Sequence, residues 1–474
     1  MTRTNAGEKI SRKVAAAIMA AACLAMASNT ATFAQDSNYW SQQYGTRSEL
    51  LGGTVVGSIV DLSATYYNPG ALGIIDDPEV LLSAQAFQYQ SVTVKDLIAL
   101  TEDIQQTRFG TAPSLFAIMI KTRWQGGKIA FSGLTRMEFK SRLVARLSRP
   151  QDVISSVPGD EFVVGEVIGE QDMGENWFGL TWARAYGAGD EHGVGVTIYG
   201  VYRGQRTRSQ ANVEIVDTTG TGGSLGFVDD YNYYHYRVLW KIGYAREFDK
   251  VSFGVTLTTP GVGLFGSGSA YFNRSIINLD VDGDSTRDSG LAANEQKDMS
   301  AEYKSPLSVA AGAKYRLKNS IIHITGEWFN SIDPYDVMSP EPFSDQISGA
   351  TLRRSFVAAA ENVFNVGVGV DYKLRERLML SGAFTTDFSF APDSTGSDHL
   401  ATNWDIYHVT MGLAGRIAGL DLTLGGDYAW GSAPQDPILD LGSISDSGDL
   451  FADRGQIEVV YKRLKFIVGF AFSF

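Results

Sequence analysis

The chain has 474 residues, of which 44% are hydrophobic and 20% are charged, and its formal net charge is −13. A mean hydropathy of −0.08 excludes a bundle of membrane-spanning helices, because each such helix needs about 20 mainly apolar residues. The 51 Gly, 21 Tyr and 25 Phe exclude a disordered chain and favour a large β-rich fold. The negative charge also disfavours nucleic acid as a partner.

The first 34 residues have the pattern of a secretory signal peptide. Four basic residues precede a short apolar run over 14–27, and small residues before Gln35 offer a cleavage site. The single cysteine, Cys23, lies inside this run, so the exported chain is expected to contain no disulfide. Residues 1–34 are therefore predicted to be removed on export.

Segments of alternating apolar and polar residues begin near residue 79. The clearest one places five apolar side chains on one face: Phe364, Val366, Val368, Val370 and Tyr372. Residues 251–258 and 420–430 follow the same period of two, which is the pattern of a strand with one apolar and one polar face. A soluble β-sandwich would also produce this alternation.

The breaks between these segments favour a different architecture. Short breaks lie near 125–127, 187–193, 247–250, 318–319, 374–376 and 416–419. Long polar breaks lie near 92–111, 145–173, 208–229, 263–299, 332–360, 391–401 and 434–453. Short and long breaks alternate strictly, as tight periplasmic turns and external loops do in outer-membrane barrels. Six short and seven long connections join 14 antiparallel strands, which predicts a transmembrane β-barrel with both ends of the chain on the periplasmic side.

Tryptophan positions support this prediction. Trp177, Trp328, Trp404 and Trp430 lie beside expected long loops, and Trp124 lies beside an expected short turn. Amphipathic aromatic side chains prefer the two membrane interfaces, so these residues are expected there.

The C-terminal segment alternates up to a terminal phenylalanine, with Phe466, Val468, Phe470, Phe472 and Phe474 on one face. This resembles the strand that outer-membrane proteins present to the barrel assembly machinery, which is a predicted partner. The apolar phase changes across 462–465, so residues 454–474 form either one bulged strand or an additional hairpin. We favour the bulge, because a hairpin would move the C-terminus outside.

Residues 35–78 lack strand alternation and are rich in small residues. They end in the run Tyr66, Tyr67, Asn68, Pro69, Gly70. With the barrel pattern that follows, this stretch resembles the FadL family of outer-membrane transporters for long-chain fatty acids and other hydrophobic compounds. In that family an N-terminal hatch plugs a 14-stranded barrel and carries an Asn-Pro-Ala motif, where this chain has Gly70 in place of the alanine.

The resemblance implies an all-β fold, a 14-stranded antiparallel transmembrane barrel plugged by a small hatch with short helices. The expected division is a signal peptide over 1–34, a hatch over 35–78, and the barrel with long extracellular loops over 79–474. It further implies a multi-pass protein of the Gram-negative outer membrane, in contact with outer-membrane lipid and lipopolysaccharide.

The function that the resemblance implies is passive uptake of hydrophobic small molecules, either long-chain fatty acids or aromatic hydrocarbons. Release would be lateral, through a gap where a kinked strand breaks the wall, without an energy source, a catalytic residue or a cofactor. We expect Asn68, Pro69 and Gly70 to form a turn in the gate beneath the ligand, and Tyr66 and Tyr67 to offer it their rings. The alternatives are a general or solute-specific aqueous porin and, less favoured, an outer-membrane enzyme or adhesin.

Three motifs resemble sites of other protein classes. Residues 222–226 (Gly-Gly-Ser-Leu-Gly) match a nucleophile elbow and residues 261–266 match a dinucleotide fingerprint, but both motifs require a following helix, which the sequence does not predict. Asp280, Asp282 and Asp284 resemble the start of a calcium loop, although Gly283 is misplaced for one. We predict no metal site and leave weak calcium binding at the three aspartates open.

Overall fold

The computed structural model describes residues 37–58, 61–75, 79–95, 104–120, 126–151, 160–279, 287–344, 351–352, 355–392, 404–417, 420–435 and 457–473. The predicted signal peptide, Trp124, the three aspartates of the calcium hypothesis and Phe474 lie outside these residues. Among the described residues, no helix is both long enough and apolar enough to cross a membrane.

Fourteen antiparallel strands form a closed barrel, as the alternation of the sequence predicts. They are β1 (Glu79–Lys95), β2 (Ile104–Ile120), β3 (Lys128–Gln151), β4 (Glu161–Tyr186), β5 (His192–Val216), β6 (Gly222–Glu247), β7 (Val251–Thr258), β10 (Ser308–Arg316), β11 (Ser320–Phe329), β16 (Val363–Arg375), β17 (Leu378–Asp387), β18 (Asp405–Ile417), β19 (Leu420–Gln435) and β20 (Ile457–Ser473). Each strand pairs with its neighbour in the chain, and β1 pairs with β20 from Glu79–Ser473 to Lys95–Glu458. This seam closes the barrel, so neither the first nor the last strand leaves a free edge to the lipid.

The outer surface is apolar where the barrel faces lipid. Along β16 the apolar residues from Phe364 to Tyr372 are exposed, whereas Asn365 and Asp371 between them are buried in the lumen. An apolar exterior with a polar interior is the reverse of a soluble protein and is typical of a membrane barrel.

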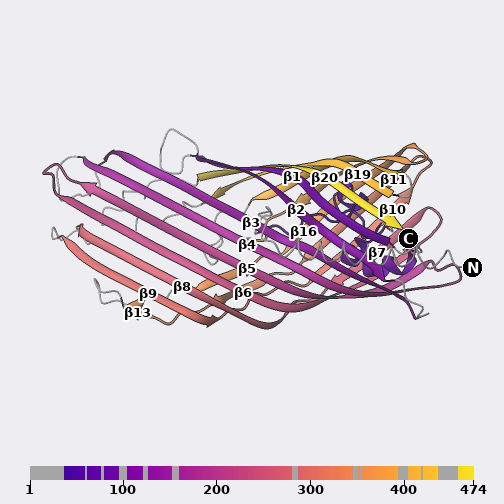
Figure 1. The fold of residues 1–474 in the computed structure, drawn as a ribbon, viewed down its shortest axis with the longest axis horizontal. Coiled ribbons are helices and arrows are strands. Elements are labelled where there is room, and N and C mark those ends of the chain that lie inside the picture. Colours follow the sequence, from indigo (N-terminus) through magenta and orange to yellow (C-terminus); the bar gives the residue numbers. More distant parts are fainter. Residues whose placement is uncertain are drawn as a thin grey trace, which may run out of the picture.

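One side of the barrel is much taller than the other. Strands β3 to β6 have 24–26 residues each and extend beyond the shorter strands at one end, together with β8 (Val262–Leu279) and β9 (Asp288–Ser300) (Figure 1). We call these six strands the tall wall. The connection between β11 and β16 adds four short strands: β12 (Ile332–Met338), β13 (Phe343–Ser344), β14 (Thr351–Leu352) and β15 (Phe356–Ala360).

Much of what the sequence predicts as long loops is therefore strand. Residues 208–229 contribute to β5 and β6 with only 217–221 between them, and most of 145–173 belongs to β3 and β4. The region 263–299 contains the β8–β9 pair. Outside the membrane both faces of a sheet can carry polar side chains, so the alternation that marks a strand disappears although the backbone pairing continues.

The C-terminal segment is one strand without a bulge, so the predicted bulge is wrong. The register of β20 against β19 is regular from Ile457 to Phe472, and the irregularity lies in β1, near Phe87. Odd-numbered residues of β20 face the lumen throughout. The apolar phase changes because Val459 and Tyr461 join an apolar cluster inside the barrel, whereas Phe466 and Phe470 face the lipid. The role of Phe470, Phe472 and Phe474 in assembly remains a prediction.

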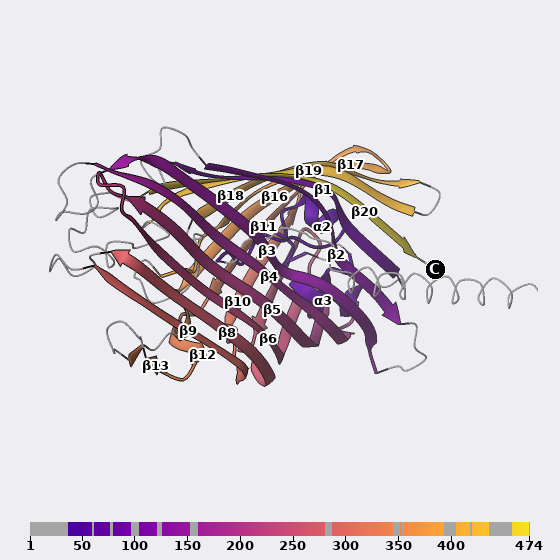
Figure 2. The ribbon, with the colours of Figure 1, turned by 60° about the vertical axis from the view of Figure 1, so that its left-hand side comes forward.

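The hatch fills the barrel at the end where the strands are joined by short turns. Its three short helices, α2 (Arg47–Leu50), α3 (Ala64–Tyr67) and α4 (Pro69–Ile74), are enclosed by strands (Figure 2). The carboxylate of Asp61 organises the segment: it accepts hydrogen bonds from Thr46 Oγ1, from the backbone N–H and hydroxyl of Ser48, and from the backbone N–H of Ser63, at 2.9–3.3 Å. A buried carboxylate with this many donors fixes the chain around it.

Glycines let the hatch approach β5, β6 and β7 backbone to backbone. A Cβ atom on Gly243 would lie 2.3 Å from Asn68 Oδ1, and one on Gly254 would lie 2.1 Å from the carbonyl oxygen of Val56. No other residue type fits at these positions without moving the hatch, which explains why glycine occurs on the inward face here.

Buried polar contacts hold the hatch on the opposite side of the barrel. Arg47 pairs with Asp371 of β16, and Ser58 of the hatch hydrogen-bonds His323 Nδ1 at 2.7 Å. Further along, the backbone N–H of Trp40 donates to Asp387 at 2.7 Å, and Lys465 donates to the carbonyl oxygen of Ser41 at 2.9 Å. The hatch is thus attached on both sides of the lumen.

Substitution of Gly254 by alanine tests this packing. Because the new Cβ would meet backbone rather than a flexible side chain, we expect it to destabilise the hatch by about 1–3 kcal/mol, seen as faster proteolysis of residues 37–75 in the assembled barrel. Gly174→Ala is the control, since nothing lies within 4 Å of its Cβ position. Equal proteolysis of the two variants would contradict the close approach.

Candidate ligand pocket

A pocket lies inside the barrel, above the hatch. It encloses about 680 Å³, counting the part that is open to solvent. Its walls come from the hatch (Tyr39, Tyr66), β3 (Arg136, Met137), β4 (Glu175, Trp177), β6 (Arg237, Leu239, Lys241), β7 (Thr258), the segment 303–306, β10 (Ser308), β11 (Glu327, Phe329), β12 (Ile332, Tyr335), β15 (358–360) and Phe390. Apolar and charged side chains thus line the same cavity, as they do in sites for amphipathic small molecules.

Aromatic rings line a large part of the pocket. Tyr39 of the hatch is stacked between Phe329 and Phe390, with ring centroids 4.1 and 4.4 Å apart. On another side the ring of Tyr66 lies 6.0 Å from that of Trp177. Rigid apolar rings provide much of the surface on which a hydrophobic ligand can be buried.

Two buried cations face the pocket without an acidic hydrogen-bond partner among the described residues. The Nη1 atom of Arg136 has no hydrogen-bond partner there, and its guanidinium lies 5.8 Å from the rings of both Tyr66 and Trp177. Lys241 donates to Thr258 Oγ1 at 3.0 Å and lies 4.4 Å above the Tyr66 ring. Cation–π contacts stabilise such charges only partly, so they remain available to an anion.

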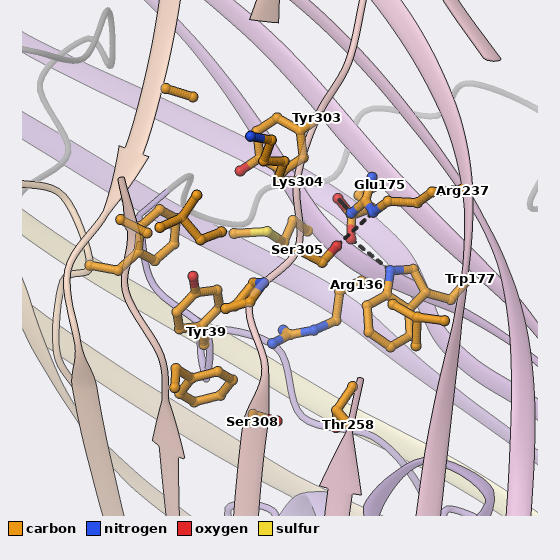
Figure 3. Close-up of a pocket in the computed structure, with 18 of the residues that line it drawn as sticks. Tyr39, Arg136, Glu175, Trp177, Arg237, Thr258, Tyr303, Lys304, Ser305 and Ser308 are labelled. Atoms are coloured by element: carbon orange, nitrogen blue, oxygen red, sulfur yellow. Dashed lines mark hydrogen bonds and ion pairs between the residues drawn. The ribbon is translucent and has the colours of Figure 1, made fainter. Parts of the chain in front are cut away.

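The two carboxylates in the pocket are already satisfied. Glu175 accepts hydrogen bonds from Arg237 at 2.6 Å, from Arg203 at 3.4 Å and from the indole N–H of Trp177 at 2.6 Å (Figure 3). Glu327 accepts from the indole N–H of Trp40 and the hydroxyl of Ser308, each at 2.8 Å. Of the six charged side chains that line the pocket, four are basic, so its charge is positive in a chain of net charge −13.

A strap over residues 303–306 covers one side of the pocket. The Tyr303 ring stacks on Arg203 at 3.7 Å, and Arg237 Nε donates to the hydroxyl of Ser305 at 2.6 Å. The arginines that neutralise Glu175 therefore also hold the strap.

The expected hatch residues divide into two groups. Tyr66 lines the pocket, and its contact with a ligand remains a prediction. Tyr67, Asn68, Pro69 and Gly70 are not among the lining residues: the Tyr67 hydroxyl donates to Gln43 at 2.7 Å and accepts from the backbone N–H of Tyr44 at 2.9 Å.

Asn68 forms the turn that the sequence predicts, but in the floor of the hatch. Its Oδ1 accepts from the Gly70 N–H at 3.0 Å, which caps α4, and Pro69 occupies the first position of that helix. Its Nδ2 donates to the carbonyl oxygens of Val56 and Tyr244 at 2.8 and 2.9 Å. The motif thus joins two parts of the hatch to β6, and its role in gating remains a proposal.

Trp177 and Trp404 are not at the membrane interface, which corrects the prediction for both. Each is buried in the lumen; Trp404 stacks on Tyr461 with centroids 5.5 Å apart. Trp328 is exposed on the outer face, as expected. The number of residues between a tryptophan and a loop indicates its position along the barrel axis. Whether it faces the lipid or the lumen depends on its odd or even position in the strand.

Beside the pocket, the backbone pairing between β2 and β3 ends. The two strands pair only from Leu115–Leu134 to Ile120–Ile129, although both continue beyond these pairs. At the same level β3 has a bulge at Arg136, and β2 carries Pro113, which has no N–H to donate. The ladder therefore ends where Arg136 enters the pocket.

Sequence reasoning missed Arg136, Glu175, Arg237 and Lys241. A signal was present, since charged residues within lipid-spanning strands must face the lumen. To identify which of the inward-facing charged residues line the pocket, one must know how neighbouring strands are staggered.

The enzyme-like motifs belong to strands. Gly222 begins β6 and Val262 begins β8, and no helix follows either one. Within the described ranges no group of His, Cys, Asp and Glu side chains could hold a metal ion. The three aspartates at 280–284 lie outside those ranges, so calcium binding there is still a hypothesis.

A 14-stranded barrel with an internal hatch and a pocket above it defines a plugged transmembrane barrel of the outer-membrane type. The fold is that of FadL-type transporters. A FadL homologue of Pseudomonas aeruginosa matches with a TM-score of 0.54 and 11% identity, over 92% of this chain and all of the other. The toluene transporter TodX of Pseudomonas putida matches with a TM-score of 0.54 and 12% identity, over 91% of this chain and 99% of its own. No protein-family model and no curated protein sequence matches the chain.

We expect Glu175→Gln to destabilise the barrel. It leaves the buried cations of Arg203 and Arg237 without their counter-charge, which costs about 3–5 kcal/mol in the free energy of unfolding. Denaturant unfolding of the protein in lipid vesicles measures the loss. Glu295→Gln, which removes the exposed pair with Lys297, is the control and should cost less than about 1 kcal/mol. Equal losses would show that Glu175 does not organise the pocket.

Proposed function

We propose that the protein is a channel for passive uptake of hydrophobic molecules across the outer membrane, and that long-chain carboxylic acids are its substrates. The observation that carries the proposal is the pocket itself, an aromatic cavity above a fixed hatch with two buried cations directed into it. The fold of FadL-type transporters supports the transport role.

The charges favour an acid over a neutral hydrocarbon. A carboxylate could take hydrogen bonds from Arg136 Nη1, which has no partner among the described residues, and its alkyl chain could lie against Tyr39, Tyr66 and Trp177. A neutral hydrocarbon such as toluene, which TodX transports, would leave the buried arginine without a counter-charge.

Lateral release is part of the proposal. The unpaired stretch between β2 and β3 begins at Arg136 and Met137, both of which line the pocket. A molecule leaving there would enter the membrane without crossing the hatch. Transport would follow the partition of the substrate into lipid and would need no energy source.

We expect the double variant Arg136→Met and Lys241→Met to take up a labelled long-chain fatty acid at least about tenfold more slowly, because one charged hydrogen bond contributes about 1.5–3 kcal/mol. Uptake of labelled toluene should not fall. The measurement is cellular uptake in a strain that lacks other such channels, with assembly verified by the heat-dependent gel shift of the barrel.

The variant Arg136→Lys serves as the control, since it keeps the charge and should keep most of the fatty acid uptake. Equal losses for the acid and for toluene would support hydrophobic transport without a preference for acids. Unchanged uptake of both by the double variant would refute the role of this pocket.

Deletion of residues 40–75 separates this proposal from the aqueous porin. Because the hatch fills the lumen, we expect the deletion to open a large ion-conducting pore in planar bilayers, whereas the intact protein should conduct little. A similar conductance with and without the hatch would favour the porin.

A further inference from the structure

The outer face of the tall wall carries a belt of charged side chains. Cross-strand ion pairs join Lys140 to Asp172, Arg142 to Glu170, Arg146 to Glu166 and Arg206 to Asp230, at 2.6–2.7 Å. Asp172 also stands opposite Arg206 in the β4–β5 ladder, and Glu170 stands opposite Arg208. The charges thus form continuous rows from β3 to β6, which we call the charged belt.

The basic groups dominate what the belt presents to its surroundings. The exposed fractions of the arginine and carboxylate side chains are 61% and 34% for Arg142–Glu170, 78% and 34% for Arg146–Glu166, and 52% and 15% for Arg206–Asp230. Only Lys140–Asp172 is reversed, at 34% and 53%. In three of the four pairs the guanidinium group is therefore more exposed than its carboxylate partner.

The belt begins directly above the apolar surface of the same strands. On β5 the exposed Ile198 and Tyr202 are followed on the same face by Arg206. On β6 the exposed Tyr236 and Tyr234 are followed by Asp230. Exposed tyrosines at the end of an apolar band mark the membrane interface, and four residues of strand span about 13 Å. The belt therefore lies at the level of the lipid headgroups.

We propose that the charged belt is a docking surface for the phosphorylated headgroups of the outer-leaflet lipid, whose chemistry is that of lipid A. Arginine binds phosphate through a planar, bidentate arrangement of donors, and a lipid phosphate would compete with the carboxylates for these exposed guanidinium groups. The belt continues the lipid-facing band, so a lipid whose acyl chains cover Ile198 places its phosphates beside Arg206. The inference does not depend on the proposed transport function.

Native mass spectrometry of the full-length protein in mild detergent tests this, with bisphosphorylated lipid A as the probe. We expect the variant Arg142→Gln, Arg146→Gln and Arg206→Gln to bind the lipid at least about tenfold more weakly. The variant Glu166→Gln and Glu170→Gln should bind it more tightly. Arg416→Gln, which removes an exposed arginine paired with Asp421 at the opposite end of the barrel, is the matched control and should bind as the wild type does.

Lipid A without its phosphates should bind weakly and equally to all of these variants. Wild-type affinity in the triple arginine variant would overturn the proposal, as would equal binding of the two forms of lipid A to the wild-type protein. If the triple variant fails to show the heat-dependent shift of a folded barrel, the glutamate variant decides, and an unchanged affinity there would overturn the proposal too.

Discussion

The backbone of a membrane barrel must satisfy all its hydrogen bonds within the sheet, because lipid offers no partner. This requirement explains the closure of β1 on β20, the regular register of β16 to β20, and the apolar exterior. It also makes the short ladder between β2 and β3 conspicuous, since that is where the wall departs from the rule. The bulge that places both Arg136 and Met137 in the lumen occurs at this point, so the break in the wall and the charge in the pocket have the same structural origin.

The sequence predicted the barrel because lipid imposes a period of two on each strand that crosses it. The prediction of strands failed outside the lipid, where this requirement no longer applies. Residues 208–229 pair as strands in the tall wall, but both faces there accept polar side chains and the pattern disappears. In β20 the apolar phase changed although the strand did not, because Tyr461 packs on Trp404 inside the barrel. An apolar residue indicates surroundings from which water is excluded. In a plugged barrel these surroundings can be the lipid outside the wall or the packed side chains inside it.

The pocket was predicted only in part, for a related reason. Tyr66, next to the short motif, lines the pocket, whereas Asn68 and Pro69 of the motif lie in the floor of the hatch. Arg136, Glu175 and Lys241 come from three strands, and their convergence depends on strand stagger and on one bulged residue. Neither quantity is visible in local sequence. The glycines of β5 to β7 also could not be interpreted from local sequence, where glycine only weakens a strand. Their role is explained by the hatch, which lies directly against them.

The attachment of the hatch to opposite walls of the barrel limits how readily the hatch can move. Backbone contacts at Gly243 and Gly254 and the buried pairs at Asp371 and Asp387 would have to break together for the hatch to move, so collective motion of the hatch on the microsecond to millisecond scale is disfavoured. Rearrangement of a single lining side chain, such as that of Met137, would leave these attachments intact. Under the proposed function, a substrate would therefore pass from the pocket to the lipid beside a hatch that stays in place.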